Sequence, residues 1–253
     1  MFTTMDVQHK LNEIADNTRQ KGSGITLTVS GIGSNITTTY EKPIKLDGNR
    51  QYELALLNLE TYYSFPNIDD MNNKMKFRKD GSSPWKTITI PTGCYEIKAI
   101  NREIVRQVTT KNVRVMPNLN TLQCVLVISD TYEVDFNMEN SLRTVLGFEP
   151  KVYKKGRHAS ENPVNILKVN SVLVHTDIIE GSYNQGRMEP ILYTFFPDVS
   201  PGEKIMQIQS PPMYHHVTTN NIYRMKTWLT DQDNKEIDLR GETLTVRLHL
   251  REC

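Results

Sequence analysis

The chain has 253 residues, 38% of them hydrophobic and 8% aromatic, which is enough to bury a substantial core within a single all-β domain. Its 30 Lys and Arg balance 29 Asp and Glu, and the formal net charge of +1 lacks the basic excess typical of proteins that bind nucleic acid. No run of about 18 apolar residues occurs, so we expect no membrane-spanning helix.

The first 22 residues are expected to form a separate N-terminal segment. Val7, Leu11 and Ile14 recur at helical spacing and are followed by a polar run that ends at Gly22. A short amphipathic helix and a flexible arm both fit this pattern. The remaining residues, 23–253, are expected to fold as one domain.

Strand patterns begin directly after this segment. Over 24–30, apolar and polar residues alternate, which is the period of a half-buried strand. Residues 51–61 are apolar on both faces and predict a central strand that is covered on both sides. Asp80 and Gly81 separate two further strand patterns within 74–90, and this dipeptide predicts a hairpin turn with positive φ.

Two short helices are predicted in the middle of the chain. Ile and Val side chains recur at helical spacing over 94–108. A second helix is expected to begin at Asn137 and to end at Gly147 in a left-handed cap, with Phe148 packed on its last turn. Residues 94–165 are expected to be either an insertion in the main domain or a second small β subdomain.

Residues 149–163 are predicted to be a basic surface loop. They include Lys151, Lys154, Lys155 and Arg157. Such a loop is compatible with contact to nucleic acid or to an acidic partner, but a solvated loop without a ligand is the simpler interpretation.

From Leu167 onward, strand patterns follow one another to the end of the chain. The clearest is 243–250, where Leu and Val alternate with polar residues that include His249. About a dozen strand segments and two or three short helices together predict an all-β fold.

No residue pattern points to an enzyme. His175 and Asp177 could ligate a metal from one face of a strand together with a distant His, but the surrounding glycines and the following Glu of such sites are missing. Phosphate-binding Gly loops and nucleophile elbows are absent, and Cys94 and Cys124 lie in apolar surroundings. We therefore expect no catalytic, cofactor-binding or metal-binding residues and no cofactor.

Short sequence words, in a fixed order, carry a family resemblance. They are IPTGCYEI (90–97), LGF (146–148), ILKVN (166–170), GSY (181–183), FFPDVSPGEKI (195–205), DQD (231–233), DLRGE (238–242) and VRLHL (246–250). In this order and spacing they resemble the minor capsid (penton) proteins of Polinton/Maverick elements and adintoviruses, which are relatives of the virophages. The resemblance extends from about residue 24 to the end of the chain.

The resemblance implies an antiparallel jelly-roll sandwich and a structural role. It implies a penton subunit that forms homopentamers at the fivefold vertices of an icosahedral shell, beside a double-jelly-roll major capsid protein. It also implies localisation in the virion after synthesis in the host cytoplasm or nucleus, with no specific nucleic acid bound and no catalytic residue.

A ring of subunits needs apolar side chains at its lateral contacts. The candidates are the aromatic residues that stand near prolines, namely Tyr62, Tyr63, Phe65, Phe195 and Phe196.

The alternative function is a jelly-roll module that binds a carbohydrate or a receptor and serves in attachment. Tyr183, Tyr214, Tyr223 and Trp228 are then the candidates for a platform on which sugar rings stack.

Overall fold

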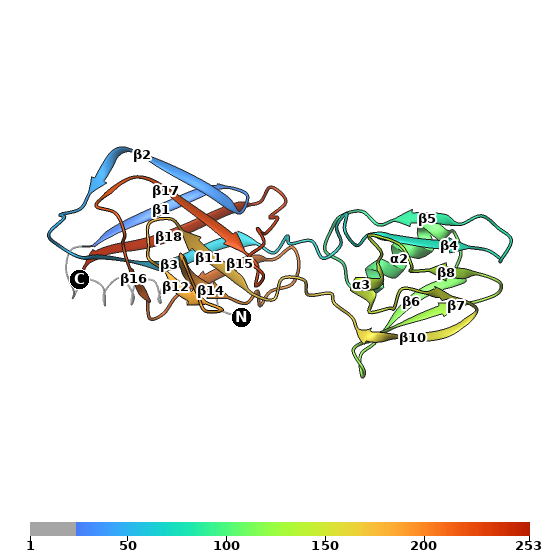
Figure 1. The fold of residues 1–253 in the computed structure, drawn as a ribbon. Coiled ribbons are helices and arrows are strands. Elements are labelled where there is room, and N and C mark those ends of the chain that lie inside the picture. Colours follow the sequence, from blue (N-terminus) through green and yellow to red (C-terminus); the bar gives the residue numbers. More distant parts are fainter. Residues whose placement is uncertain (1–23) are drawn as a thin grey trace. The chain divides into compact units, whose positions relative to one another are not determined.

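The computed structural model describes residues 24–253, which divide into two compact units (Figure 1). Of these residues, unit 1 comprises 24–64 and 170–253, and unit 2 comprises 65–169. Unit 2 is therefore an insertion in the sequence of unit 1. The expected insertion of 94–165 falls inside unit 2, which begins earlier, at Phe65. The predicted N-terminal segment, 1–22, lies outside the described residues.

Unit 1 consists of two antiparallel sheets. The first has the order β1 (Ile25–Ile32), β18 (Thr243–Glu252), β3 (Tyr52–Tyr62) and β15 (Lys204–Ile208), and β16 (Tyr214–His216) also pairs with β3. The second has the order β14 (Ile191–Phe195), β11 (Val172–Thr176), β17 (Asn221–Thr230) and β2 (Asn35–Lys45). A small hairpin of β12 (Ser182–Asn184) and β13 (Arg187–Glu189) connects β11 to β14.

The strand order of unit 1 is that of a jelly roll. With β16 taken as the continuation of β15, the eight main strands can be lettered B to I along the chain as β1, β2, β3, β11, β14, β15, β17 and β18. The two sheets then read B-I-D-G and C-H-E-F, which is the jelly-roll arrangement. Unit 2 is inserted between strands D and E. The all-β jelly-roll fold expected from the sequence is confirmed.

The last strand shows why the sequence folds in this way. Leu244, Val246, Leu248 and Leu250 of β18 are all buried at 1% exposure or less, as the alternation predicts. Burial of each such side chain contributes about 1.5–3 kcal/mol. β18 pairs with β1 on one side and with β3 on the other. The first and last strands of the described chain are therefore neighbours in the first sheet.

Unit 2 is a smaller β structure with its own core. One sheet has the order β5 (Lys86–Thr89), β4 (Lys74–Arg78), β8 (Glu133–Asp135) and β9 (Val152–Tyr153). The other has the order β10 (Gly156–Pro163), β7 (Gln123–Ile128) and β6 (Val113–Asn118). In the chain, α2 (Ile97–Val108) lies between β5 and β6, and α3 (Arg143–Leu146) lies between β8 and β9. No helix in the described part of the chain is long and apolar enough to cross a bilayer.

Helix α2 confirms the helix predicted over 94–108. Its apolar stripe, Ile97, Ile100, Ile104 and Val108, is buried in the core of unit 2. The helix packs against β6 and β5. A stripe with this spacing is buried because residues three and four apart lie on the same helical face.

The second predicted helix is shorter than expected. Gly147 ends it with a φ of 81°, and the N–H groups of Gly147 and Phe148 both donate to the carbonyl of Arg143, at 2.8 and 3.0 Å. The helix begins at Arg143 and not at Asn137, so that part of the prediction was wrong. The preceding segment is held on β4 instead, because Leu142 donates its N–H to the carbonyl of Lys74.

The β4–β5 hairpin is present, but its turn has a different cause from the one predicted. The carboxylate of Asp80 accepts hydrogen bonds from the N–H and the hydroxyl of both Ser82 and Ser83, at 2.7–3.0 Å. Gly81 does not adopt a positive φ. The turn is therefore built on the Asp80 side chain, which is a common way for Asp to stabilise a loop.

Candidate functional site

The structure separates the five predicted interface residues into two groups. Tyr62 is 41% exposed and Phe196 is 70% exposed, so both rings are available to a neighbouring molecule. Tyr63, Phe65 and Phe195 are buried at 8% or less. Buried rings offer no surface to another subunit, and the interface stays a prediction for Tyr62 and Phe196 alone.

These two rings lie beside one rim of the jelly roll. Phe196 directly follows β14, and Tyr62 pairs with Lys204 of β15; β14 and β15 are the outer strands of the two sheets on that side. Met206 of β15 adds a third exposed apolar side chain, at 41%. We call Tyr62, Phe196 and Met206 the F/G rim.

The opposite rim is formed by β1 and β2, which contact each other. Ile25 and Ile32 mark the two ends of β1 and are 48% and 75% exposed. We call these two residues the B rim. Unit 1 therefore presents exposed apolar side chains on two different lateral surfaces.

The two candidate metal ligands are each engaged in the second sheet. The Nε2 of His175 lies 2.8 Å from the hydroxyl of Thr230, and its ring stacks on Trp228 with the centroids 5.0 Å apart. Burial lowers the pKa of His175 to about 4. Asp177 accepts a hydrogen bond from the N–H of Lys226 at 2.8 Å. Among the described residues, no group of three or more His, Cys, Asp or Glu could hold a metal ion.

The four aromatic residues of the sugar-platform hypothesis do not form a common surface. Tyr214 belongs to the first sheet, and the guanidinium of Arg251 covers its ring at 3.4 Å. Trp228 belongs to the second sheet and is stacked on a histidine. Tyr183 on the β12–β13 hairpin and Tyr223 on β17 are 74% and 58% exposed. Rings from different sheets, two of them already covered, make no stacking platform.

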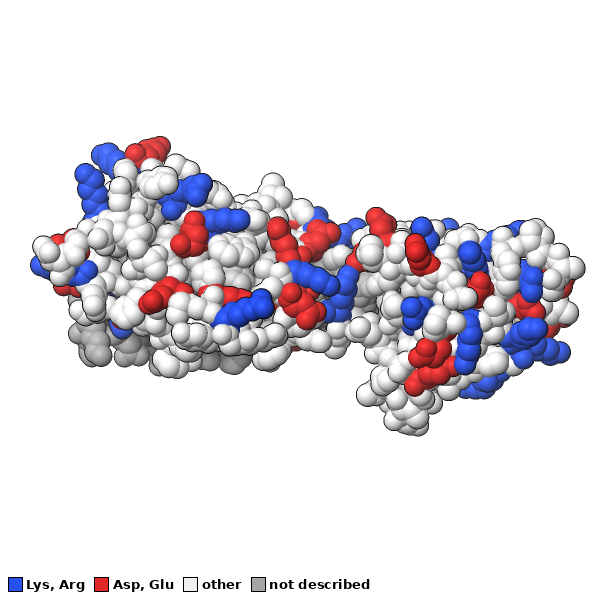
Figure 2. Space-filling model, in the orientation of Figure 1, with Lys and Arg blue, Asp and Glu red and all other residues white. Residues whose placement is uncertain are grey.

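Although the whole chain is nearly neutral, its two units carry net charges of opposite sign. Unit 2 has 16 Lys and Arg against 11 Asp and Glu, which gives a net charge of +5. The described part of unit 1 has 11 Lys and Arg against 15 Asp and Glu, which gives −4. Figure 2 shows Lys and Arg side chains gathered at the right-hand end of unit 2, near the ends of β7, β8 and β10.

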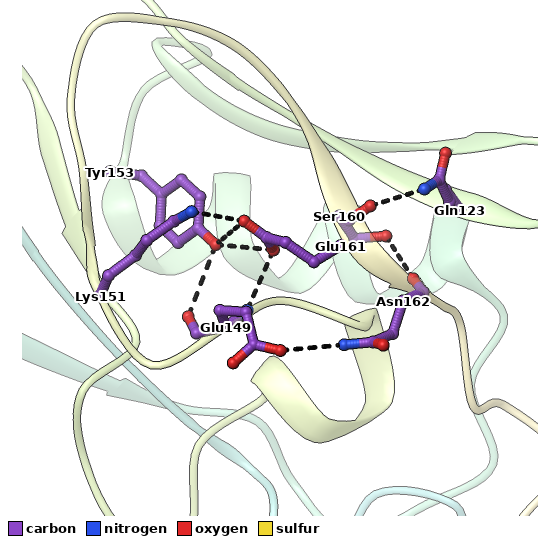
Figure 3. A network of polar contacts seen from close by, with 7 residues as sticks. All are labelled: Gln123, Glu149, Lys151, Tyr153, Ser160, Glu161 and Asn162. Atoms are coloured by element: carbon purple, nitrogen blue, oxygen red, sulfur yellow. Dashed lines mark hydrogen bonds and ion pairs between the residues drawn. The ribbon is translucent and has the colours of Figure 1, made fainter.

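A polar cluster lies between β9 and β10 in this unit (Figure 3). The carboxylate of Glu161 accepts hydrogen bonds from the Nζ of Lys151 at 2.5 Å and from the hydroxyl of Tyr153 at 2.9 and 3.0 Å. It also accepts the N–H of Glu149 at 3.1 Å. The side-chain amide of Asn162 donates to the carboxylate of Glu149 at 3.2 Å. These contacts fix the positions of the two carboxylates.

Electrostatics keep this cluster charged. Burial acts to raise the pKa of Glu161, but the hydrogen bonds from Lys151, from the Glu149 N–H and from Tyr153 outweigh it and lower the pKa to about 2. Burial and the neighbouring carboxylate raise the pKa of Tyr153 well above its usual range. Glu161 is therefore ionised and Tyr153 is protonated at physiological pH.

Beside the cluster, a shallow depression of about 550 Å³ is lined by Lys151, Val152, Tyr153, Lys154, Arg157, His158, Ala159 and Glu161. The segment 149–163 was predicted to be a loop, but it contains β9 and the whole of β10. Its cations differ in their pairing. The Nζ of Lys154 lies 3.7 Å from Glu133, whose other oxygen is paired with Arg78 at 2.5 Å. Lys155 and Arg157 are both exposed and form no ion pair within residues 24–253.

Comparison with known proteins finds solved structures that resemble the chain at low sequence identity. No family model matches the chain, and no curated protein matches it. The crystal structure of the mavirus penton protein aligns with 91% of this chain and 100% of its own, with 10% identity and a TM-score of 0.49. The D2–D3 domains of the flagellar cap protein FliD from Escherichia coli align with 83% of this chain at 14% identity and a TM-score of 0.19. Both TM-scores are too low to support a statement about function.

Proposed function

We propose that this chain is the penton subunit of an icosahedral capsid. It forms homopentamers at the fivefold vertices, beside a double-jelly-roll major capsid protein, and acts in the virion without a catalytic step. The observation that carries the proposal is the jelly roll of unit 1, with its B-I-D-G and C-H-E-F sheets, in a chain whose ordered sequence words resemble penton proteins.

The distribution of exposed apolar side chains supports assembly into a ring. A closed ring is built from heterologous contacts, in which one surface of each subunit meets a different surface of the next. Unit 1 offers two such surfaces, the F/G rim and the B rim. The most exposed apolar residue of the F/G rim is Phe196, at 70%, and that of the B rim is Ile32, at 75%. We infer that the F/G rim of one subunit packs on the B rim of its neighbour.

The experiment measures the oligomeric state of the full-length chain. Native mass spectrometry should detect a species of about 145 kDa, five times the 29.1 kDa of the chain. Phe196→Ser and Ile32→Ser should each weaken assembly by about tenfold or more, because buried aromatic and aliphatic anchors dominate interface energies. Leu119→Ser is the matched control, since Leu119 is 82% exposed but lies in unit 2.

Two outcomes would contradict the proposal. A chain that stays monomeric at every concentration and salt, and also in the presence of the major capsid protein, is no vertex subunit. If Phe196→Ser and Leu119→Ser changed the strength of assembly equally, the pentamer would stand but the F/G rim would not be its contact surface.

A further inference from the structure

We propose that the β9–β10 depression of unit 2 is a binding site for a sulfated polysaccharide. Lys154 and Arg157, which line the depression, contact its sulfate groups together with Lys155, which adjoins Lys154 in the chain, and the fixed carboxylate of Glu161 accepts hydrogen bonds from its hydroxyls. This site goes beyond the capsid role and uses neither rim of unit 1.

The first argument is the surplus of cations at this place. Lys151 is neutralised by Glu161 at 2.5 Å, so it belongs to the cluster and not to a ligand. Lys154 shares Glu133 with Arg78 and is itself 74% exposed. Lys155 and Arg157 form no ion pair with any described residue. Three cations thus stand within four consecutive positions of the chain, and only Lys154 has an acidic partner, the shared Glu133. Two of the three, Lys154 and Arg157, line the depression.

The second argument is the chemistry of the floor. Three donors hold the Glu161 carboxylate, and the single hydroxyl proton of Tyr153 is shared between its two oxygens. The Glu161 side chain remains 32% exposed and lines the depression, where a ligand hydroxyl can donate to the oxygen that this shared proton leaves. Val152 is 42% exposed at the edge of the depression and offers apolar contact to the C–H face of a sugar ring. A ligand for this surface needs anionic groups that pair with the Lys and Arg side chains, and hydroxyls that donate to the Glu161 carboxylate. A sulfated sugar carries both kinds of group.

The surface fits nucleic acid less well. Proteins that bind duplex DNA through its backbone contact about 6–10 phosphates, whereas only three cations here lack full compensation. Single strands are bound by exposed aromatic rings that stack on bases. The exposed large apolar side chains of unit 2 are Met71, Leu119, Leu122, Val152 and Leu167, none of which is aromatic. The described part of unit 2 therefore has no strongly exposed aromatic ring for stacking.

The experiment uses the full-length chain and a heparin-derived hexasaccharide, with the fully desulfated hexasaccharide as the reference ligand. The test variant is K154Q/K155Q/R157Q. The matched control is K98Q/R102Q/K111Q, which likewise removes two Lys charges and one Arg charge, but from exposed positions elsewhere in unit 2. Isothermal titration calorimetry at physiological salt should show binding of the sulfated ligand that the test variant weakens by about tenfold or more, and the control by less than about twofold.

Several outcomes would overturn the proposal. It fails if the sulfated hexasaccharide does not bind, if the desulfated one binds equally well, or if both triple variants lose the same affinity. Tighter binding of a short DNA duplex, lost in the test variant, would assign the site to nucleic acid. Self-association lost in the test variant would assign it to an acidic surface of a second copy. Because the test variant leaves both rims intact, its oligomeric state in the same sample distinguishes this failure from failure of the capsid role.

Discussion

Two glycines of unit 1 with nearly the same backbone angle should respond very differently to substitution by alanine. Gly181 has a φ of +91°, and a Cβ there would lie 1.9 Å from the carbonyl oxygen of Glu189 and 2.6 Å from the Cα of Pro190. Gly202 has a φ of +88°, and a Cβ there would meet nothing within 4 Å. The pair separates the cost of the backbone angle from the cost of steric overlap.

The magnitudes follow from these contacts. An L side chain at positive φ costs about 1–2 kcal/mol, so Gly202→Ala should lower the free energy of unfolding by that amount alone. In Gly181→Ala the overlap is with backbone, which must move. That backbone carries the pairing of Ser182 with Glu189 and the hydrogen bond from Thr176 N–H to the Pro190 carbonyl at 3.1 Å. With these two contacts weakened at about 0.5–1.5 kcal/mol each, the total loss should be about 2–5 kcal/mol.

The assay follows from the two tryptophans, Trp85 in unit 2 and Trp228 in unit 1. In a Trp85→Phe background, urea denaturation followed by fluorescence reports on unit 1 alone. The two alanine variants are compared in that background. Equal losses in the two variants, or a Gly181→Ala variant within about 1 kcal/mol of the parent, would refute the steric argument.

Three further results are expected. Since the pKa of His175 is about 4 in the folded chain, against 6.5 for an unperturbed histidine, the unfolded state takes up a proton first as the pH falls. Unit 1 should lose roughly 3 kcal/mol between about pH 6.5 and 4, and His175→Phe should remove this slope. Glu161, with a pKa of about 2 against 4.5, should contribute stability to unit 2 above pH 4.5 that is lost towards pH 2, and Glu161→Gln should flatten that curve. Burial raises the pKa of Cys124 to about 12, so iodoacetamide at mildly alkaline pH should label exposed Cys253 and spare Cys124 until unit 2 unfolds.

Local sequence patterns predicted helices and strands well where one face of the element is buried and the other is exposed to solvent. The alternation in β18 and the apolar stripe of α2 both depend on neighbouring residues only, and both predictions were confirmed. The order of the sheets could not be derived in this way. Ile25 pairs with Leu250, and no periodicity specifies which of many similar strands lies beside another. The jelly-roll expectation rested on the family resemblance instead.

The segment of the candidate site was missed for a physical reason. β10 is an edge strand of its sheet, and nearly all of its residues are exposed or partly exposed, so it has no apolar face to reveal it. A segment rich in Lys, Gly and Arg without an apolar alternation is typical of a loop, and this one was therefore predicted to be a loop. A similar limit applies to Phe195 and Phe196, which look alike in sequence, whereas the register of β14 with β11 buries the first and leaves the second exposed.

The segregation of charge gives the two proposed interactions opposite responses to salt. In the proposed ring, the contacts join unit 1 to unit 1, and each described unit 1 has a net charge of −4, so like charges oppose assembly while the apolar rims favour it. Screening weakens the repulsion and leaves the apolar contact intact. Polysaccharide binding at unit 2 depends on attraction to a surface of charge +5 and should weaken as salt rises. Between about 0.05 and 0.5 M NaCl, the pentamer fraction should therefore hold or increase while the hexasaccharide affinity falls. If both decreased together, the rims would not be the apolar contacts inferred from the structure, and charge between the units of different copies would hold the ring.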